Sequence, residues 1–520
     1  MISALQTDKL IAKKSVWLVV VFTFLRLLFS SFLNLGNDES YYLTYAQQLQ
    51  INYFDHPPMV AIWIKFFTAN LALQDSLFFI RLGSLVGCAL SSFFIYKAIT
   101  AISTARAGFA GVFLYNISFY ASITAGLFIF PDTPQLVFWT ASMYFITQIL
   151  RDDKKILPWL CFGACAGLSI MSKVHAVFLW GGVFLYAVFY RRSWLSNKAL
   201  YISAAVTAII ISPILTWNIQ NDFITFRFHG ERVVVNEKSG FNFMGLLRET
   251  VGQFILNNPF TIGLIILFFT KKHPSSTGSA IKVFKLMGVP LLVVIFFLSM
   301  FRTTLPHWSG PAYISLLPIA AIGLSEMSIA KFNLFTRSAF SYNVILIALI
   351  ITAVNFYPGT FSNEAGAALG KTDISLDAYG WKEGGEKFAA IYKSRKLTSK
   401  APMLCNTWWG AHDEYYFARP LNIKMIGLGS VLDVHHYAWR LKYDTINIKM
   451  DTAYAVVHSY DYFDAKKAFG NYYSKIDSIA TIPIIRGGKL AYNFYIYELS
   501  NKKIQTISKK TFQQTLIRSN

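Results

Sequence analysis

A short polar stretch after the first apolar run of the chain combines carboxylates, aromatic rings and an imidazole. It contains NDESYY at residues 37–42 and YFDHPP at residues 53–58. A carboxylate can take the proton of an attacking hydroxyl group. Adjacent helical side chains diverge by about 100°, so Asp38 and Glu39 cannot serve one atom in the same way. We expect one of them to act chemically while the other orients or binds; a plain acidic loop is the simpler alternative.

Cations and an imidazole occur in other segments between apolar runs. Such groups, or a metal ion, could stabilise the charge that a phosphate leaving group gains in a transition state. Plainer interpretations also exist, since Asp132 could cap a helix, Lys173 could extend to the membrane surface and His229 could be an ordinary surface residue. The cations and the imidazole are Lys173, Arg227, His229, Arg232 and Arg302, and the carboxylate Asp132 lies in another of these segments.

The composition indicates a membrane protein. Of 520 residues, 54% are hydrophobic and only 14% are charged, whereas an average soluble protein has about 25% charged residues. These values exclude a soluble enzyme and a disordered chain. The net charge of +21 would suggest a nucleic-acid partner in a soluble protein, but here the basic residues lie between long apolar runs. The four cysteines do not form the pattern of a disulfide framework or a thiolate zinc site.

Eleven stretches approach the length of about 20 apolar residues that a membrane helix needs. Lys and Arg are concentrated in alternate connections, which places the N-terminus in the cytoplasm and the chain after about residue 358 on the other side. The apolar segment 59–73 is short and predicts a helix lying in the membrane interface. The predicted spans are 15–33, 77–97, 107–125, 131–150, 156–172, 175–190, 199–217, 249–270, 283–301, 309–327 and 341–357.

The sequence predicts a membrane domain at residues 1–357, with an acidic outside loop at 34–76, and a soluble domain at residues 358–520. The soluble domain lacks long apolar runs, and its pattern favours an α/β fold with strands at 453–457 and 490–497 and a helix at 381–394. We expect the polar stretch 501–520 to fray. Trp408, Trp409 and His412 could stack on a sugar, although a buried core is the simpler interpretation.

Several motifs, taken in their order along the chain, resemble a known family. They are DESYY at 38–42, YFDHPP at 53–58, PDTP at 131–134, SK at 172–173 and WSGPAY at 308–313. This set is similar to bacterial membrane glycosyltransferases of the protein O-mannosyltransferase and aminoarabinose transferase type, which are family 39-like. The resemblance implies a GT-C fold, a polytopic α-helical membrane protein of about 11 transmembrane helices. It adds interfacial helices in the first outside loop and a site at the outer membrane face. The resemblance covers roughly residues 10–360, and the C-terminal extracytoplasmic α/β domain is predicted from its own residue pattern.

The same resemblance implies roles for individual residues. Asp38 matches the family's acidic residue that is treated as catalytic base or acceptor-orienting group. Asp55 matches a second acidic position associated with metal or substrate, and His56 stands where aminoarabinose transferases typically have lysine. The predicted site therefore comprises Asp38 and Glu39 as catalytic residues; His56, Lys173, Arg227, Arg232 and Arg302 for the donor phosphate; Tyr41, Tyr42 and Asp132 for substrate; and Asp55 and His229 for a divalent metal ion, if one is used.

The implied function is transfer of a sugar from a polyprenyl-phosphate donor at the outer face of the bacterial inner membrane. The acceptor could be lipid A, another glycolipid, a wall polymer or a protein, and no nucleic acid is expected. Direct displacement would invert the anomeric configuration, because the base and the leaving phosphate lie on opposite faces of the sugar. A transporter or lipid flippase and a non-catalytic assembly protein remain alternatives. Carboxylates at outside helix ends, and no sign of two related halves, favour the enzyme.

Overall fold

The computed structural model describes residues 2–235, 240–398, 400–443 and 451–503. The chain forms two compact units. The helical unit comprises residues 1–28 and 49–346, and the C-terminal unit comprises residues 29–48 and 347–520. The two acidic motifs belong to different units. Residues 37–42 are in the C-terminal unit, and residues 53–58 are in the helical unit.

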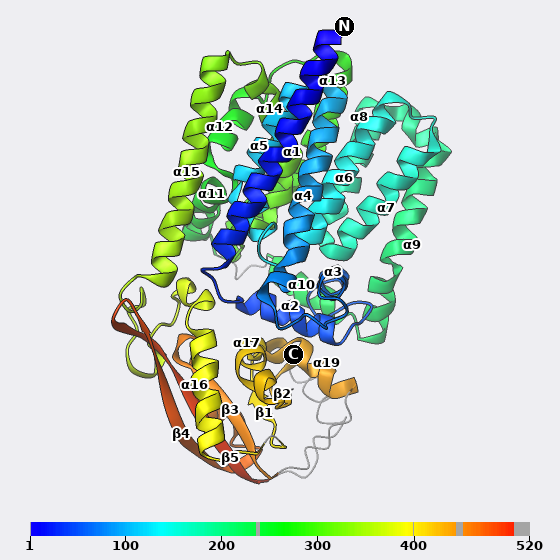
Figure 1. Cartoon of the computed structure of the whole chain (residues 1–520). Helices are drawn as coiled ribbons and strands as arrows, with labels where there is room; N and C mark the ends of the chain where they lie inside the picture. Colours follow the sequence, from blue (N-terminus) through cyan, green and yellow to red (C-terminus); the bar gives the residue numbers. More distant parts are fainter. Residues whose placement is uncertain (1, 236–239, 399, 444–450, 504–520) are drawn as a thin grey trace. The chain divides into compact units, whose positions relative to one another are not determined.

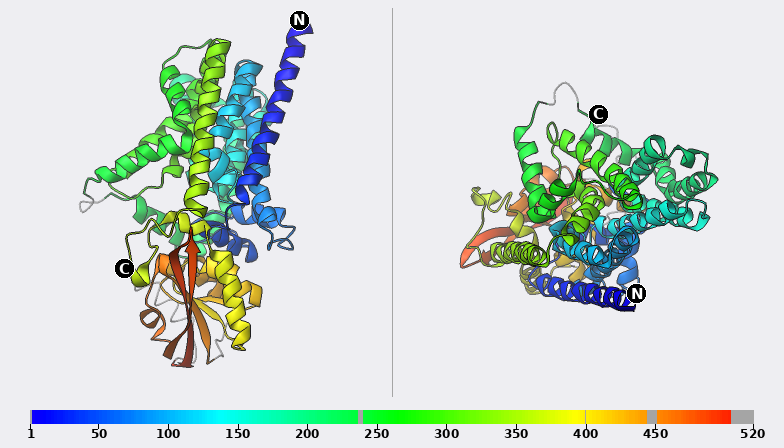
Figure 2. Two further views of the ribbon diagram at one scale, coloured as in Figure 1. Left: turned by 60° about the vertical axis from the view of Figure 1, so that its left-hand side comes forward. Right: turned by 90° about the horizontal axis from the view of Figure 1, so that it is seen from above.

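The helical unit is an assembly of long helices and shorter ones (Figure 1). Viewed from above in Figure 2, α1 lies at the edge of this assembly. In chain order its elements are α1 (Ile2–Ser30), α3 (Met59–Phe67), α4 (Leu77–Ile102), α5 (Ala105–Ile117), η1 (Tyr120–Thr124), α6 (Asp132–Arg151), α7 (Ile156–Ser172), η2 (Val174–Val177), α8 (Phe178–Tyr190), η3 (Arg192–Ser196), α9 (Lys198–Gln220), α10 (Ile224–Val233), α11 (Phe243–Asn257), α12 (Pro259–Phe268), α13 (Ser275–Ser299), η4 (Pro306–Ser309), α14 (Gly310–Ser325) and α15 (Ile329–Asn355), which continues into the C-terminal unit.

All eleven predicted spans overlap helices, although several extend a few residues beyond a helix end or across a break. The stretch 249–270 is not one straight helix, because α11 and α12 meet at 98°. The chain bends there at Asn258, which has a φ of +64°, followed by Pro259 at the first position of the next helix. Within the described part of the chain, five helices are long and apolar enough to cross a membrane, or six if the bent pair is one span. The total of eleven spans therefore stays a prediction, as does the interfacial position of α3.

The helices differ in how much of their apolar surface other parts of the protein cover. The apolar window of the span that includes α14 is 89% buried, whereas that of α15 is 17% buried. α14 is therefore a central helix, and α15 presents its side chains outward, as a helix facing lipid does. Close packing at α7 and α9 depends on Gly163, where an added Cβ would lie 2.3 Å from the Ser203 carbonyl oxygen.

The C-terminal unit combines helices with a five-stranded sheet in the order β2-β1-β3-β5-β4. β1 pairs in parallel with β2 and β3, and β5 pairs antiparallel with β3 and β4. In the left view of Figure 2, the long β4–β5 hairpin twists beside α16. The elements are α2 (Asn37–Gln47), η5 (Gly366–Ala368), η6 (Ile374–Ala378), α16 (Trp381–Ser394), β1 (Met403–Cys405), α17 (Gly410–Asp413), η7 (Glu414–Ala418), η8 (Arg419–Leu421), β2 (Met425–Gly427), α18 (Val431–Val434), α19 (His436–Tyr443), β3 (Ala453–His458), η9 (Ser459–Asp461), α20 (Ala465–Phe469), β4 (Tyr473–Arg486) and β5 (Lys489–Lys502).

The predicted α/β character of this unit is confirmed. The helix at 381–394 has the predicted bounds, and the two predicted strands correspond to β3 and β5. β4 was not predicted, because Lys475, Asp477 and Pro483 interrupt its apolar pattern. The pairing of β4 with β5 depends on the two-residue turn at Gly487 and Gly488, which both have positive φ. Residues 504–520, most of the stretch expected to fray, lie outside the described residues.

The predicted aromatic cluster of the tail lies against other rings of the unit. His412 is fully buried, with its ring centroid 4.1 Å from that of Trp381. Trp408 is half-buried and stacks in parallel on His435 at 5.8 Å. This packing favours the interpretation of the cluster as part of the core.

Candidate active site

A buried ion pair lies at the ends of two helices of the helical unit. Asp132 is the first residue of α6, and Lys173 directly follows α7. The Lys173 Nζ donates to both carboxylate oxygens of Asp132, at 3.0 and 2.8 Å, and the two side chains are only 8% and 2% exposed. The Tyr120 hydroxyl, from the π-helical turn η1, donates to Asp132 Oδ1 at 2.9 Å. Asp132 is thus a buried anion with two donors, rather than a simple helix cap.

Three histidines from separate segments lie within electrostatic range of this pair. His56, His175 and His307 each interact electrostatically with both Asp132 and Lys173. The Nε2 of His175 also lies 3.1 Å from the Gln135 amide nitrogen. The cluster thus contains one cation, one carboxylate and three imidazoles, which are groups that can neutralise or donate to an anionic ligand. The sequence prediction included His56 and Lys173 but not His175 or His307, although both stand in short turns between apolar helices.

The segment 53–56 connects this cluster to α10. His229 Nε2 lies 2.7 Å from the backbone carbonyl oxygen of Asp55, and the rings of His56 and His229 are 6.3 Å apart. Burial lowers the pKa of His56 to about 4, with Asp55 opposing the shift and Lys173 adding to it. Burial also lowers the pKa of His229. Both imidazoles are therefore neutral near pH 7 and would contact an anion through a hydrogen bond.

The predicted metal ligands Asp55 and His229 are in contact, but through the Asp55 backbone. Within the described residues there is no group of three or more His, Cys, Asp or Glu side chains placed to hold a metal ion. Carboxylate and imidazole are suitable ligands for a divalent ion such as zinc. This pair could therefore supply part of a coordination sphere, and a metal would need its other ligands from water or substrate.

The three predicted phosphate-binding arginines have different surroundings. Arg227 is exposed and donates to the Asp222 carbonyl, and Arg302 donates to the Val234 carbonyl, from its Nε at 2.9 Å. Arg232 lies over the rings of Phe228 and Trp308, at 4.8 and 5.8 Å, and acts electrostatically on His229. Of the three, Arg232 has the contacts that connect it to the histidine segment.

Residues 37–42 form the start of α2 in the C-terminal unit. Asp38 is exposed at the second position of this helix. Glu39 is fully buried, and its Oε2 accepts a hydrogen bond from the Gly36 N–H at 3.0 Å. Tyr41 and Tyr42 are buried, and the Tyr45 hydroxyl donates to that of Tyr41 at 3.0 Å. The two adjacent carboxylates therefore differ in environment, with one facing solvent and the other closing the helix start.

Two buried arginines in apolar helices were not among the predicted residues. Arg26 in α1 donates to the side chains of Asn116 and Ser122, both at 3.0 Å. Arg81 in α4 is 1% exposed and lies over the Phe128 ring at 5.3 Å. A lone charge inside an apolar run is the signal that could have identified them.

Comparisons with known proteins match this architecture. Residues 55–217, which carry Asp55, His56, Asp132 and Lys173, match the family described as dolichyl-phosphate-mannose-protein mannosyltransferase. The chain is 21% identical over 279 residues to the lipid A galacturonosyltransferase RgtD of Rhizobium johnstonii, covering 54% of this chain and 58% of that relative. The chain thus spans less than two thirds of the length of this relative.

Two crystal structures of ArnT from Cupriavidus metallidurans have a similar fold. The apo structure aligns with a TM-score of 0.58 and 13% identity, over 92% of this chain and 97% of ArnT. The structure bound to undecaprenyl phosphate aligns over the same shares with a TM-score of 0.57 and 13% identity. At this identity the likeness concerns the fold. Together, the matched family, the RgtD relative and the ArnT fold confirm the predicted resemblance to GT-C membrane glycosyltransferases of the family 39-like type.

Proposed function

We propose that this protein transfers a sugar from a polyprenyl-phosphate donor to an acceptor of the bacterial envelope. The observation that carries the proposal is the buried Asp132–Lys173 pair with its three histidines, because it concentrates anion-binding groups at helix ends of the helical unit. A polyprenyl chain can remain among apolar helices while its phosphate meets polar side chains.

In this proposal the helical unit binds the donor phosphate. Lys173 is neutralised by Asp132 in the structure, so the pair has no net charge before substrate binds. An arriving phosphate would share the Lys173 ammonium with Asp132 and accept hydrogen bonds from neutral His56, His175 or His307. As the bond to the sugar breaks, negative charge grows on the phosphate, and these prepositioned groups stabilise it. Arg232 adds positive charge beside His229, and Arg227 and Arg302 attract the anionic head group over a longer range.

Asp38 is the proposed base. It is exposed and at the start of a helix, where the helix dipole favours the ionised carboxylate. The carboxylate would take the proton of the acceptor hydroxyl as its oxygen bonds to the anomeric carbon and the phosphate departs with the bonding electrons. One displacement of this kind inverts the anomeric configuration. Tyr41 and Tyr42 are proposed to shape the substrate site, and Glu39 to hold the helix start.

A glycolipid is the acceptor that we propose first. RgtD is named as a lipid A galacturonosyltransferase, and the similarity to it covers 54% of this chain. The chain would act in the bacterial inner membrane, with its C-terminal unit on the outer side, as the distribution of Lys and Arg predicts. Wall polymers and proteins are the other acceptors to test, and the identity of the sugar is part of the same experiment.

A divalent metal ion could assist at Asp55 and His229. Bound there, it would add positive charge for the donor phosphate. Isothermal titration of the purified protein with Zn²⁺, compared between wild type and His229→Ala, tests this part separately. Binding that His229→Ala leaves unchanged would contradict a metal at this pair.

The central experiment uses purified full-length protein with synthetic undecaprenyl-phosphate sugars and lipid A as substrates. Product is detected by mass spectrometry, and its anomeric configuration by NMR. We expect Asp38→Asn to lower turnover by about 10²–10⁴-fold, the usual contribution of a general base. The matched control is Asp464→Asn, because Asp464 is also an exposed aspartate at a helix start in the C-terminal unit. Wild-type turnover by folded Asp38→Asn would overturn the assignment of the base.

The rival function as a transporter or flippase predicts a different result. Wild-type protein in liposomes would then move a labelled polyprenyl-phosphate lipid between leaflets and form no glycosylated product with any acceptor. Mass spectrometry of envelope glycans from a deletion strain gives an independent answer, because a transferase deletion removes a sugar from an envelope component.

A further inference from the structure

We propose that the C-terminal part of the chain positions the catalytic base, and that Asp377 is the positioning residue for Asp38. This inference rests on the proposed function, since it takes Asp38 as the base. It concerns contacts within the C-terminal unit, which contains both α2 and residues 347–520.

The first observation is that the start of α2 has a cap from a distant part of the sequence. Helix N-termini leave backbone N–H groups without intrahelical acceptors, and a side chain at the N-cap usually accepts from them. The N-cap of α2 is Gly36, which has no side chain. Asp377 supplies the carboxylate instead, and the Asn37 N–H donates to its two oxygens at 3.2 and 3.4 Å. An added Cβ at Gly36 would lie 3.0 Å from Asp377 Oδ2, so this approach is close.

The residues before the helix are held in the same way. The Leu35 N–H donates to the Tyr416 hydroxyl at 2.7 Å, and the Leu35 carbonyl lies 2.8 Å from His412 Nε2. The Asn34 N–H donates to the Ala378 carbonyl at 3.0 Å. The backbone of Asn34, Leu35 and Asn37 is therefore bound to residues between 377 and 416. The backbone of Gly36 is bound to Glu39.

The helix itself packs on the same part of the chain. α2 lies against α17. The ring centroids of Tyr41 and Trp408 are 5.3 Å apart, and those of Tyr45 and His436 are 4.9 Å apart. These edge contacts lie one and two turns beyond Asp38, so they fix the axis of the helix as well as its start.

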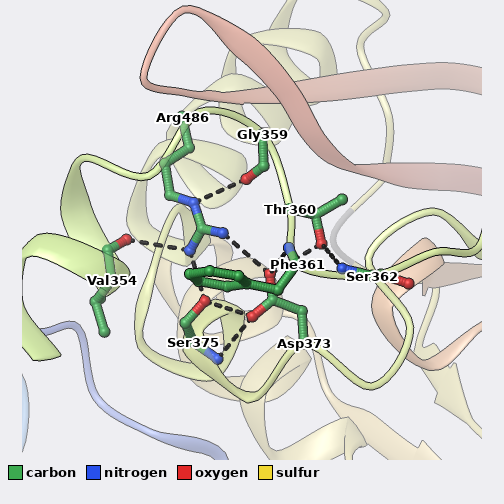
Figure 3. A network of polar contacts seen from close by, with 8 residues as sticks. All are labelled: Val354, Gly359, Thr360, Phe361, Ser362, Asp373, Ser375 and Arg486. Atoms are coloured by element: carbon green, nitrogen blue, oxygen red, sulfur yellow. Dashed lines mark hydrogen bonds and ion pairs between the residues drawn. The ribbon is translucent and has the colours of Figure 1, made fainter.

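The segment that carries Asp377 is in turn anchored by a buried ion pair, shown in Figure 3. Arg486 Nη2 donates to Asp373 Oδ2 at 3.0 Å, and the two side chains are 0% and 1% exposed. Asp373 also accepts from the N–H groups of Phe361 and Ser375, at 2.9 and 3.0 Å. Because Asp373 is the N-cap of η6, which contains Asp377, this network sets where the Asp377 carboxylate lies.

Asp38 is the residue after Asn37, so its backbone is fixed by the contact with Asp377. Burial, followed by the nearby charge of Asp38, raises the pKa of Asp377 to about 7. Removal of the Asp377 side chain would let the first turn of α2 shift, and a displacement of about 1 Å of a reacting group can lower the rate about 10²-fold.

The test compares Asp377→Ala and Asp377→Asn with the wild type in the transfer assay, with turnover normalised to the folded fraction. We expect Asp377→Ala to lower kcat by about 10–100-fold while KM for the donor stays within about twofold. Asp377→Asn keeps an oxygen that accepts from Asn37 and should retain most of the turnover. The matched control is Asp464→Ala, because Asp464 caps α20 in the same unit through Lys466 and Lys467 N–H groups, at 2.8 and 3.3 Å.

The possible results separate the two proposals. Wild-type kcat in Asp377→Ala, or an equal loss in Asp464→Ala, overturns the positioning role while leaving Asp38 as the base. Wild-type turnover in Asp38→Asn overturns the assignment of Asp38 as the base, whereas the absence of any transfer product from the wild type contradicts the proposed function itself. If Asp377→Ala does not fold, Tyr416→Phe removes both hydroxyl contacts with Leu35 and keeps the ring. A several-fold loss of kcat in folded Tyr416→Phe supports the inference, and unchanged kcat overturns it.

Discussion

Asp132 in the helical unit and Asp38 in the C-terminal unit are both acidic residues at a helix start, but their surroundings are opposite. Asp132 is 2% exposed and neutralised by Lys173. Asp38 is exposed, and its nearest backbone neighbour is held by another carboxylate, Asp377. A buried charge needs a partner of opposite sign, whereas a charge in water does not. In the proposed function this difference has a use: the helical unit receives the donor anion, and the C-terminal unit presents an exposed carboxylate.

The largest expected effect tests the helical side of this comparison. Lys173→Met leaves Asp132 as a buried charge without its partner, which should destabilise the protein by about 3–5 kcal/mol. The double variant Lys173→Met/Asp132→Leu removes both charges and should recover much of this stability but no transfer activity. Denaturant titration of the detergent-solubilised proteins measures the free energy of unfolding of each variant.

Lys97→Met is the control for that experiment, because Lys97 is an exposed lysine of the same unit. If Lys173→Met is no less stable than Lys97→Met, the ion pair does not have the role in folding that its burial implies. If the double variant is stable and fully active, Lys173 does not bind the donor phosphate.

The next effect is a pH dependence on the C-terminal side. The pKa of Asp377 is raised to about 7 in the folded protein, from an ordinary value of 3.8. The folded state therefore retains a proton that the unfolded chain releases, so stability from this group is present below pH 4 and is lost as pH rises through 7. We expect wild type to lose about 1–3 kcal/mol over this range relative to Asp377→Asn. If wild type and Asp377→Asn show the same pH dependence of stability, the pKa of Asp377 is not raised by burial and the nearby Asp38.

The helices of the helical unit were predicted from the sequence because apolar length is a local property. The eleven stretches overlap helices, and α7 has the predicted bounds. The bend between α11 and α12 was not predicted, although Asn258 and Pro259 mark it in the sequence. Hydropathy averaged over a window does not register two residues that redirect the chain.

The candidate site was predicted only in part, because its contacts join distant segments. Acidic motifs indicated Asp38 and Asp55, but no local pattern shows that Asp377 caps the helix of Asp38, 339 residues earlier in the chain. In the same way, His175 and His307 have no motif and are recognised by their shared neighbours, Asp132 and Lys173. Long-range pairing of single polar residues is set by tertiary packing.

A smaller effect distinguishes the two adjacent carboxylates of α2. Glu39 is buried and accepts from the Gly36 N–H, so we expect Glu39→Ala to cost about 1 kcal/mol, as loss of a helix cap does. Glu39→Gln keeps an acceptor oxygen and should retain at least half of wild-type kcat. A loss of two orders of magnitude in Glu39→Gln, with folding intact, would instead make its charge part of the chemistry.

The smallest effect concerns Arg227, an exposed guanidinium that donates to the Asp222 carbonyl. Exposed charges act over about 8–10 Å at physiological salt, so Arg227→Ala should raise the donor KM by less than about threefold and leave kcat unchanged. The difference should disappear at high salt, where long-range attraction is screened. Steady-state kinetics at two salt concentrations, with Arg232→Ala in parallel, checks this. A large, salt-independent loss in Arg227→Ala would mean that it contacts the phosphate directly, and that anion binding extends beyond the buried cluster of Asp132 and Lys173.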